Sequence, residues 1–248
     1  MHKLVDTHAH TTFSDGVLSV EQLIAQVTAL GVRPSVADHC SRDVRGTLHS
    51  IDAIRGYLDE LEKHEVFRGG EFCWHDSLWR ELPDDLAARF THRLGSLHAV
   101  VLPNGSVLHA FASPWPAGLD PQDYMDAHLH NLERFAVEMP VDILAHPTLL
   151  PMALRKTPLE ELWTEPREER AVAALARAGI AFEISNRYRP HERFVRRAVD
   201  AGVRISLGSD GHTAEQVGRI AWPHEMAKRL GVADDQLFDP LVHARNPR

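Results

Sequence analysis

Short apolar runs alternate with longer amphipathic stretches along nearly the whole chain of 248 residues. The runs predict strands over 4–10, 32–39, 66–73, 94–101, 141–146, 180–185 and 203–209. The stretches predict helices over 19–30, 50–64, 83–90, 121–137, 166–178, 190–201 and 213–230, the last interrupted by Pro223. This alternation favours a parallel α/β sheet, and so many units in a row favour closure into a barrel, with an open doubly wound sheet as the alternative.

The sequence offers no internal boundary at which two domains could be divided. It contains no repeat, no low-complexity tract and no Gly/Ser-rich linker. We therefore expect a single domain over residues 1–248, with the closing segment 232–248 packed across the base of the barrel.

Composition excludes several classes of function. The net charge of −8 and the pI near 6.1 argue against a protein that mainly binds nucleic acid or an anionic membrane. No apolar run approaches the roughly 18–20 residues that span a bilayer, and the first residues lack the apolar core of a signal peptide. With only two cysteines, Cys40 and Cys73, the chain has no disulfide framework, so we expect a cytoplasmic protein.

Histidine is abundant, at 17 residues, and many histidines and carboxylates lie at the ends of predicted strands. In parallel α/β folds, functional groups gather at the carboxyl ends of the strands. The candidates at those ends are Asp6, His8, His10, Asp15, Asp38, His39, Glu71, His98, His146, Asp210 and His212. Burying so many polar groups on one rim without a partner would cost several kcal/mol, so the pattern predicts a metal site.

The H-x-H pair at the first strand has a direct geometric reason. Alternate strand residues point to the same face, so His8 and His10 can bind one ion together. Asp6 shares this parity and could accept the second ring N–H of a histidine, and Asp38 is a similar supporting candidate. The mixture of imidazole and carboxylate suits Zn, Mn or Fe better than Ca or Mg. Cys40 and Cys73 lie beside the candidate ligands and could supply a thiolate, although a free cysteine is more commonly a small buried side chain.

The order of the motifs DTHAHTTFSDG, ADH, GGE, GSLH, LAHP and GSDGH resembles the PHP (polymerase and histidinol phosphatase) family, from Val5 to about Leu230. The resemblance implies a distorted (βα)7 TIM-like barrel, the PHP fold, around up to three divalent metal ions. It implies that His8, His10, Glu71 and Asp210 hold one ion, that Glu71 bridges to a second held by His98 and His146, and that Asp15, His39 and His212 hold the third. Asp15 stands where some members have His. The sixth strand departs from the family pattern in Glu183-Ile184-Ser185-Asn186, which leaves open whether Ser185 or Asn186 faces the site.

Within that family the chain looks most like the small single-domain histidinol-phosphate phosphatases. We therefore expect a metal-dependent phosphoric monoester hydrolase acting on a small phosphate ester, with L-histidinol phosphate as the best candidate. A metal-bridging hydroxide would attack phosphorus in line. Arg155, Arg187 and Arg189 are candidates to bind the phosphate or the rest of the substrate, and His75 is a candidate to flank the site or to protonate the leaving group.

Other functions stay open at this point. The opening TTFSDGVLS is equally typical of the nucleotide-phosphatase branch of the family, and some PHP domains are nuclease or editing modules attached to DNA polymerases. The net negative charge of the chain argues against electrostatic binding of DNA. The full set of candidate ligands argues against a non-catalytic module, and the lack of any lysine between Lys63 and Lys156 argues against an amidohydrolase with a bridging lysine.

Overall fold

A computed structural model describes residues 4–43, 46–111 and 114–244. Its centre is a six-stranded parallel sheet with the strand order β10-β9-β8-β5-β4-β2. The strands are β2 (His39–Cys40), β4 (Glu71–Cys73), β5 (Leu94–Ser96), β8 (Ile143–Leu144), β9 (Ala181–Ser185) and β10 (Ile205–Gly208). Two more strands, β1 (Ser35–Val36) and β3 (Phe67–Arg68), form a separate parallel pair. The predicted α/β class with a mostly parallel sheet is thus confirmed.

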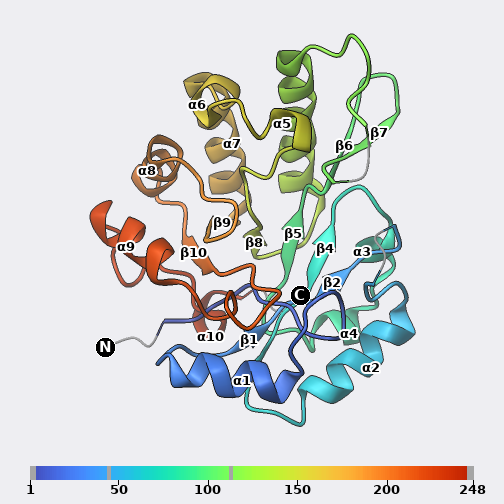
Figure 1. Cartoon of the computed structure of the whole chain (residues 1–248), viewed down its shortest axis with the longest axis vertical. Helices are drawn as coiled ribbons and strands as arrows, with labels where there is room; N and C mark the ends of the chain where they lie inside the picture. The colour runs from blue at the N-terminus through green and yellow to red at the C-terminus, as the bar shows by residue number, and fades with distance from the viewer. Residues whose placement is uncertain (1–3, 44–45, 112–113, 245–248) are drawn as a thin grey trace.

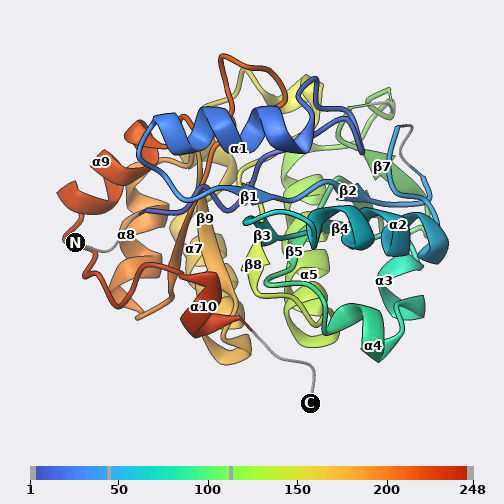
Figure 2. The same ribbon diagram turned by 90° about the horizontal axis from the view of Figure 1, so that it is seen from below.

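Helices lie at the periphery of the molecule, around the strands of the six-stranded sheet (Figures 1 and 2). They are α1 (Val20–Ala29), α2 (Ile51–Leu61), α3 (Leu78–Glu81), α4 (Asp84–Ala87), α5 (Pro121–Glu138), η1 (Met152–Leu154, 3-10), α6 (Leu159–Leu162), α7 (Glu165–Ala178), α8 (Glu192–Asp200), α9 (Ala221–Arg229) and α10 (Pro240–His243). Helix α1 begins at a capping box in which Ser19 and Gln22 each bond the other's backbone N–H. Helix α7 ends at Gly179 in the left-handed conformation that glycine adopts readily. None of the helices described is long and apolar enough to cross a membrane.

The first predicted strand, residues 4–10, is present as extended backbone with isolated bridges rather than as a regular ladder. On one side the Thr7 amide donates to the Leu207 carbonyl at 3.0 Å, and Ala9 bridges Gly211. On the other side Val5 bridges Arg33, and the Ala37 amide donates to the Ala9 carbonyl at 2.8 Å. Segment 4–10 is therefore hydrogen-bonded to the chain beside β10 and also to the chain around β1.

Other predicted elements are shorter than expected. The predicted strand 94–101 breaks after Ser96, and its second half, β6 (Ala99–Val101), forms an antiparallel hairpin with β7 (Val107–His109). The prediction of one helix over 213–230 is wrong: only Ala221–Arg229 is helical. Pro223 lies in the first turn of that helix, where its missing N–H has no intrahelical partner to lose. A proline there marks the start of a helix and not an interruption.

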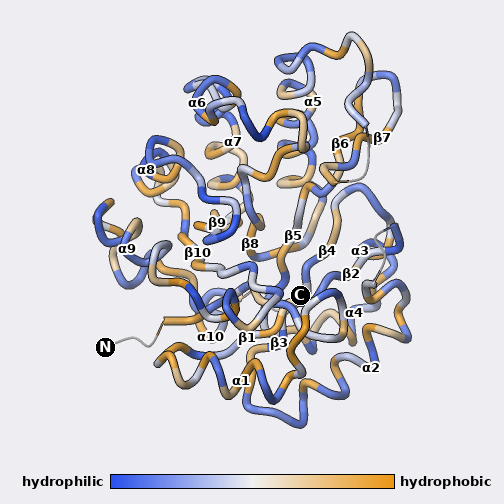
Figure 3. Tube along the Cα trace, in the orientation of Figure 1, coloured by the Kyte–Doolittle hydropathy of each residue, from blue (hydrophilic) through white to orange (hydrophobic). Residues whose placement is uncertain are grey.

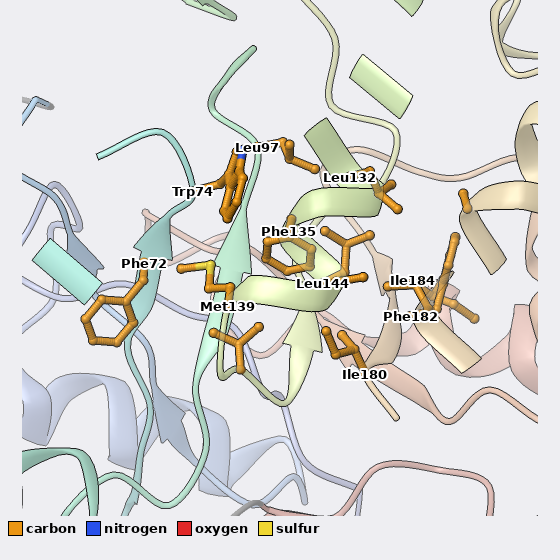
Figure 4. Packing of buried hydrophobic residues seen from close by; sticks show 14 of the residues in the cluster. Phe72, Trp74, Leu97, Leu132, Phe135, Met139, Leu144, Ile180, Phe182 and Ile184 are labelled. Atoms are coloured by element: carbon orange, nitrogen blue, oxygen red, sulfur yellow. The ribbon is translucent and has the colours of Figure 1, made fainter. Parts of the chain in front are cut away.

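The helices pack on the sheet through their apolar faces, and polar and apolar residues alternate along α1 and α2 in the hydropathy trace (Figure 3). Phe135 of α5 lies among Trp74, Met139 and Leu144 (Figure 4). The Phe135 and Trp74 rings are 6.3 Å apart in a T-shaped arrangement. A Cβ at Gly95 would lie 2.3 Å from the Phe135 ring, so this glycine lets the helix approach β5 closely.

The described part of the closing segment packs near the start of β10. The Phe238 amide donates to the Ile205 carbonyl at 2.8 Å, and the Ile205 amide donates to the Gln236 carbonyl at 2.9 Å. The Phe238 side chain is buried in a small cluster with Ala37, Leu94, Ile143, Ala145 and Ala181. These contacts agree with the expected packing at the base, while residues 245–248 lie outside the described chain.

Candidate metal centre

Nine side chains from seven places along the chain meet beyond the carboxyl ends of the strands. They are His8 and His10 on segment 4–10, Asp15 in the following loop, His39 on β2, Glu71 on β4, His98 after β5, His146 after β8, and Asp210 and His212 after β10. All nine belong to the ligand set implied by the family resemblance. Eight of them are at most half exposed and most are fully buried, and Asp15 is the exposed member.

Glu71 is the carboxylate around which four imidazoles gather. Its Oε1 lies 2.8 Å from Nε2 of His146 and 3.2 Å from Nε2 of His98. Its Oε2 lies 2.6 Å from Nδ1 of His39 and 3.4 Å from Nε2 of His8. The two oxygens of Glu71 thus face different pairs of imidazoles.

A second group gathers at the more exposed side around Asp15. Its Oδ1 lies 3.3 Å from Nε2 of His212, 3.5 Å from Nε2 of His39 and 4.0 Å from Nδ1 of His10. Asp210 lies between the two groups, with Oδ1 3.4 Å from Nε2 of His10 and 3.5 Å from Nδ1 of His212. The whole set is thus continuous, with no member far from the others.

The donor atoms are spaced as ligands of shared ions are. Two ligands that each lie about 2.1 Å from a tetrahedral ion are about 3.4 Å apart, and many of the contacts above are near that value. Among the described residues, several buried polar atoms here have no hydrogen-bond partner, namely Nε2 of His8, Nε2 of His10, Nδ1 of His39 and Oε2 of Glu71. Such buried groups are rarely left unpaired without a function. The residues therefore fit divalent metal ions.

The protonation states of the cluster are strongly perturbed. Burial would raise the pKa of Glu71, but His39, His98 and His8 hold it well below its usual range. Burial likewise opposes a charge on His8, yet Glu183 and Glu71 raise the pKa of His8 well above its usual value. Burial and the neighbouring His39 lower the pKa of His10 to about 3. Perturbations of both signs within one cluster are typical of functional sites.

Two of the nine residues have a backbone conformation that L-residues rarely adopt. His146 has φ 31° and Asp210 has φ 50°, and they are the two non-glycine residues with positive φ in the described chain. Such conformations cost on the order of 1–3 kcal/mol each and cluster at functional sites. Each of them lies two residues beyond the end of a strand, β8 or β10, where its side chain enters the cluster.

The carboxylates that support the cluster differ in part from expectation. Asp6 was expected to accept from a histidine ring, but its carboxylate accepts from the Ser209 amide at 2.8 Å, the Ser209 hydroxyl at 2.6 Å and the Gly218 amide at 2.9 Å. It therefore holds the loop that carries Asp210. Asp38 accepts from the Thr11 amide at 2.8 Å and from the Ser14 hydroxyl at 2.5 Å, and so holds the loop that carries Asp15.

The carboxylate that does contact a histidine ring is Glu183, which sequence reasoning did not select. Its Oε1 lies 2.8 Å from Nδ1 of His8, and its side chain is fully buried. A glutamate inside an otherwise apolar strand signals that it has a buried polar partner, but the sequence does not say which residue that partner is. On the same strand Ser185 is buried and accepts from the Tyr188 amide, whereas Asn186 bonds Arg189.

A cavity of about 470 Å³ opens onto the cluster. Besides cluster residues, it is lined by Asp43, His109, Phe111, Arg187 and Tyr188. One guanidinium nitrogen of Arg187 lies 2.6 Å from Nδ1 of His212 and 4.0 Å from Asp210. Arg187 is thus the predicted substrate arginine that reaches the cavity.

The other predicted substrate residues lie further out. The Arg155 guanidinium lies 5.1 Å from the Phe111 ring centre and 5.7 Å from that of Tyr188, so it packs on the cavity's aromatic wall. Arg189 packs over Trp222 at 4.7 Å and is not among the residues lining the cavity. His75 is also outside that lining, although its ring lies 5.0 Å from that of His109.

Fold and cluster together define an α/β protein with a candidate multinuclear metal centre at the carboxyl edge of its sheet. No family model matches the chain. In sequence it is 24% identical over 226 residues to a probable histidinol-phosphatase of Thermotoga maritima, covering 87% of both chains. In structure it is similar to the histidinol phosphate phosphatase of Lactococcus lactis, solved in complex with zinc, L-histidinol and phosphate, with a TM-score of 0.69, 17% identity and coverage of 93% and 95%. Both proteins carry a histidinol phosphatase name, in agreement with the resemblance on which the motif analysis rests.

Proposed function

We propose that this chain is a metal-dependent phosphomonoesterase that hydrolyses a small phosphorylated metabolite, with L-histidinol phosphate as its substrate. The observation that carries the proposal is the cluster around Glu71, in which buried nitrogen and oxygen atoms face one another without hydrogen-bond partners among the described residues. The relatives named above are a probable histidinol-phosphatase and a histidinol phosphate phosphatase solved in complex with zinc.

The nine clustered residues are the proposed ligands of up to three divalent ions, Zn, Mn or Fe. We assign His8, His10, Glu71 and Asp210 to the first ion and Glu71, His98 and His146 to the second. We assign Asp15, His39 and His212 to the third. Supporting the first and third assignments, the donor atoms of His8, His10 and Asp210 lie within 4.8 Å of one another, as do those of Asp15, His39 and His212. Supporting the second, Oε1 of Glu71 lies 2.8 Å from His146 and 3.2 Å from His98.

When bound, the ions would lower the pKa of water toward 7 and neutralise charge on a phosphate monoester. The chain's own contribution is to hold its donor atoms in fixed places before substrate arrives, which is how preorganised electrostatics lowers a barrier. Glu71 keeps its negative charge because imidazoles surround it, and the strained backbone of His146 and Asp210 fixes the directions of two donors. Burial of most of the cluster excludes water from all sides but the cavity.

Arg187 is the proposed phosphate-binding side chain, since it lines the cavity beside Asp210 and His212. A guanidinium can donate two parallel hydrogen bonds to phosphate oxygens. Phe111 and Tyr188, backed by Arg155, would form the wall against which the rest of the substrate packs. Arg189 and His75 would act on the substrate only indirectly, because neither lines the cavity.

We also propose that the sheet closes into a distorted (βα)7 barrel and that residues 1–248 form a single domain. The support is segment 4–10, which is hydrogen-bonded toward β10 on one side and toward β1 on the other. Closure would explain how His8 and His10 reach both Glu71 of β4 and Asp210 after β10.

The test is phosphate release by protein loaded with zinc or manganese. The panel contains L-histidinol phosphate, nucleoside monophosphates, nucleoside bisphosphates and short oligonucleotides. We expect kcat/KM for L-histidinol phosphate to be at least about tenfold above the others, roughly the effect of one pocket contact. Preferential cleavage of oligonucleotides, or no hydrolysis of any compound by metal-loaded protein, would overturn the proposal.

A further inference from the structure

Glu183 lies on β9 and contacts both segment 4–10 and the residues that follow β8. It projects from β9, and its two carboxylate oxygens contact two residues that we propose as metal ligands. Oε1 lies 2.8 Å from Nδ1 of His8, and Oε2 accepts a hydrogen bond from the His146 backbone amide at 2.5 Å. The side chain is fully buried. A fully buried carboxylate with two such contacts must have a specific role, because an unpaired one would be very costly.

The contact with His8 decides which ring nitrogen carries the proton. An ionised carboxylate only accepts, so Nδ1 is the donor, and in the neutral imidazole that a metal ion requires Nε2 then presents its lone pair. Nε2 of His8 has no hydrogen-bond partner among the described residues, and it faces Glu71 at 3.4 Å and Asp210 at 3.9 Å. The ring nitrogen that would bind a metal is therefore the one aimed at the cluster.

The contact with His146 acts on the backbone. His146 has φ 31°, a conformation that needs support from its surroundings, and the bond from its amide to Glu183 supplies it. Among the other cluster histidines, Nδ1 of His98 meets the Ser96 hydroxyl at 3.2 Å, and Nδ1 of His39 faces Glu71, itself a proposed ligand, at 2.6 Å. Glu183 differs from both partners because it is a carboxylate that is not among the nine proposed ligands.

Gly208 on the adjacent strand provides the space that Glu183 occupies. A Cβ at this position would lie 1.9 Å from Oε1 of Glu183 and 2.9 Å from Cβ of His8. An alanine there would force the carboxylate or the histidine to shift. Gly208 is part of the GSDGH motif, so the motif supplies room for Glu183 as well as the ligands Asp210 and His212.

We propose that Glu183 is a positioning residue, which fixes the His8 tautomer for metal binding and at the same time holds the strained His146. The inference rests on the proposed metal-dependent function. Loss of a carboxylate partner of a metal-bound histidine commonly lowers metal affinity about 10–100-fold. In Glu183→Gln the single amide oxygen can accept from His8 or from His146 but not from both, so the amide NH2 would face a donor.

The experiment is a titration of metal-stripped protein with Zn²⁺ against a chromophoric chelator, and with Co²⁺ followed by its visible absorption. We expect Glu183→Gln to weaken the tightest Zn²⁺ site about 10–100-fold and to change the Co²⁺ spectrum. Gly208→Ala should weaken the same site. The matched control is Glu168→Gln, which removes another fully buried carboxylate bonded to His191 and Arg193, and it should leave both readouts unchanged.

A third readout does not depend on any variant folding. In the zinc-loaded native protein, ¹⁵N-detected imidazole NMR should find the proton of His8 on Nδ1. Equal Zn²⁺ affinity and equal Co²⁺ spectra for native protein and Glu183→Gln, or a His8 proton on Nε2, would overturn the role of Glu183. A native protein that binds neither ion would overturn the proposed function itself, and the inference with it.

Discussion

Protonation of His92 should lower the free energy of unfolding of this protein in mild acid. Its ring is 1% exposed, and Nε2 lies 3.0 Å from the carbonyl oxygen of Thr7, directly before the H-x-H pair. Burial lowers the pKa of His92 to about 4. A histidine with a lowered folded pKa contributes stability above its unfolded pKa of about 6.5, and that stability is lost as the pH falls toward the folded value. Between pH 7 and pH 5 the loss is about 2 kcal/mol.

The assay is urea unfolding of metal-stripped native protein and of His92→Gln at pH 7 and pH 5. Glutamine keeps a donor for the Thr7 carbonyl but does not titrate, so the native protein's advantage over the variant should shrink by about 2 kcal/mol between the two pH values. His128, whose pKa burial also lowers to about 4, titrates in both proteins and cancels. An advantage that does not change with pH would refute the reasoning.

Three further predictions concern the site and the core. Glu71→Gln should reduce bound metal and lower kcat at least about 100-fold, as measured by elemental analysis and phosphate release, because it removes a charge shared by four imidazoles; full metal content would contradict this. Arg187→Lys should raise KM about tenfold, while Arg189→Lys, on the same loop, leaves KM unchanged, since only Arg187 lines the cavity; equal effects would refute the assignment. Gly95→Ala should destabilise by about 1–3 kcal/mol in urea unfolding through overpacking against Phe135, and a stability equal to native would show that the helix can shift.

The sequence was sufficient to predict the α/β class, because strand and helix periods differ and capping residues mark boundaries. Ser19 predicted the start of α1, and Gly179 ends α7 in the left-handed conformation. The break after Ser96 and the hairpin that follows could not be read, because residues 94–101 form one apolar run whichever way the chain turns. The predicted helix over 213–230 is longer than the observed Ala221–Arg229, because a proline is compatible both with the first turn of a helix and with a break inside one.

The candidate site was predictable to the extent that its residues follow strand ends. The alternation of side chains along a strand predicts that His8 and His10 share a face. The parallel topology predicts that Glu71 and Asp210 lie near them at the carboxyl edge of the sheet, as observed. Partners that lie across strands were not predictable, because they depend on register. Asp6 binds the backbone of the Ser209 loop and Glu183 binds His8, and no local pattern distinguishes these two roles.

The most direct test of the account is the metal content of the purified protein, measured by elemental analysis for the native chain and for His8→Ala/His10→Ala. The account predicts a native protein that carries divalent ions, up to three per chain, and a variant that retains markedly fewer while its fold persists by circular dichroism. Undiminished metal in the variant, or a native protein that takes up no ion from zinc or manganese, would contradict it.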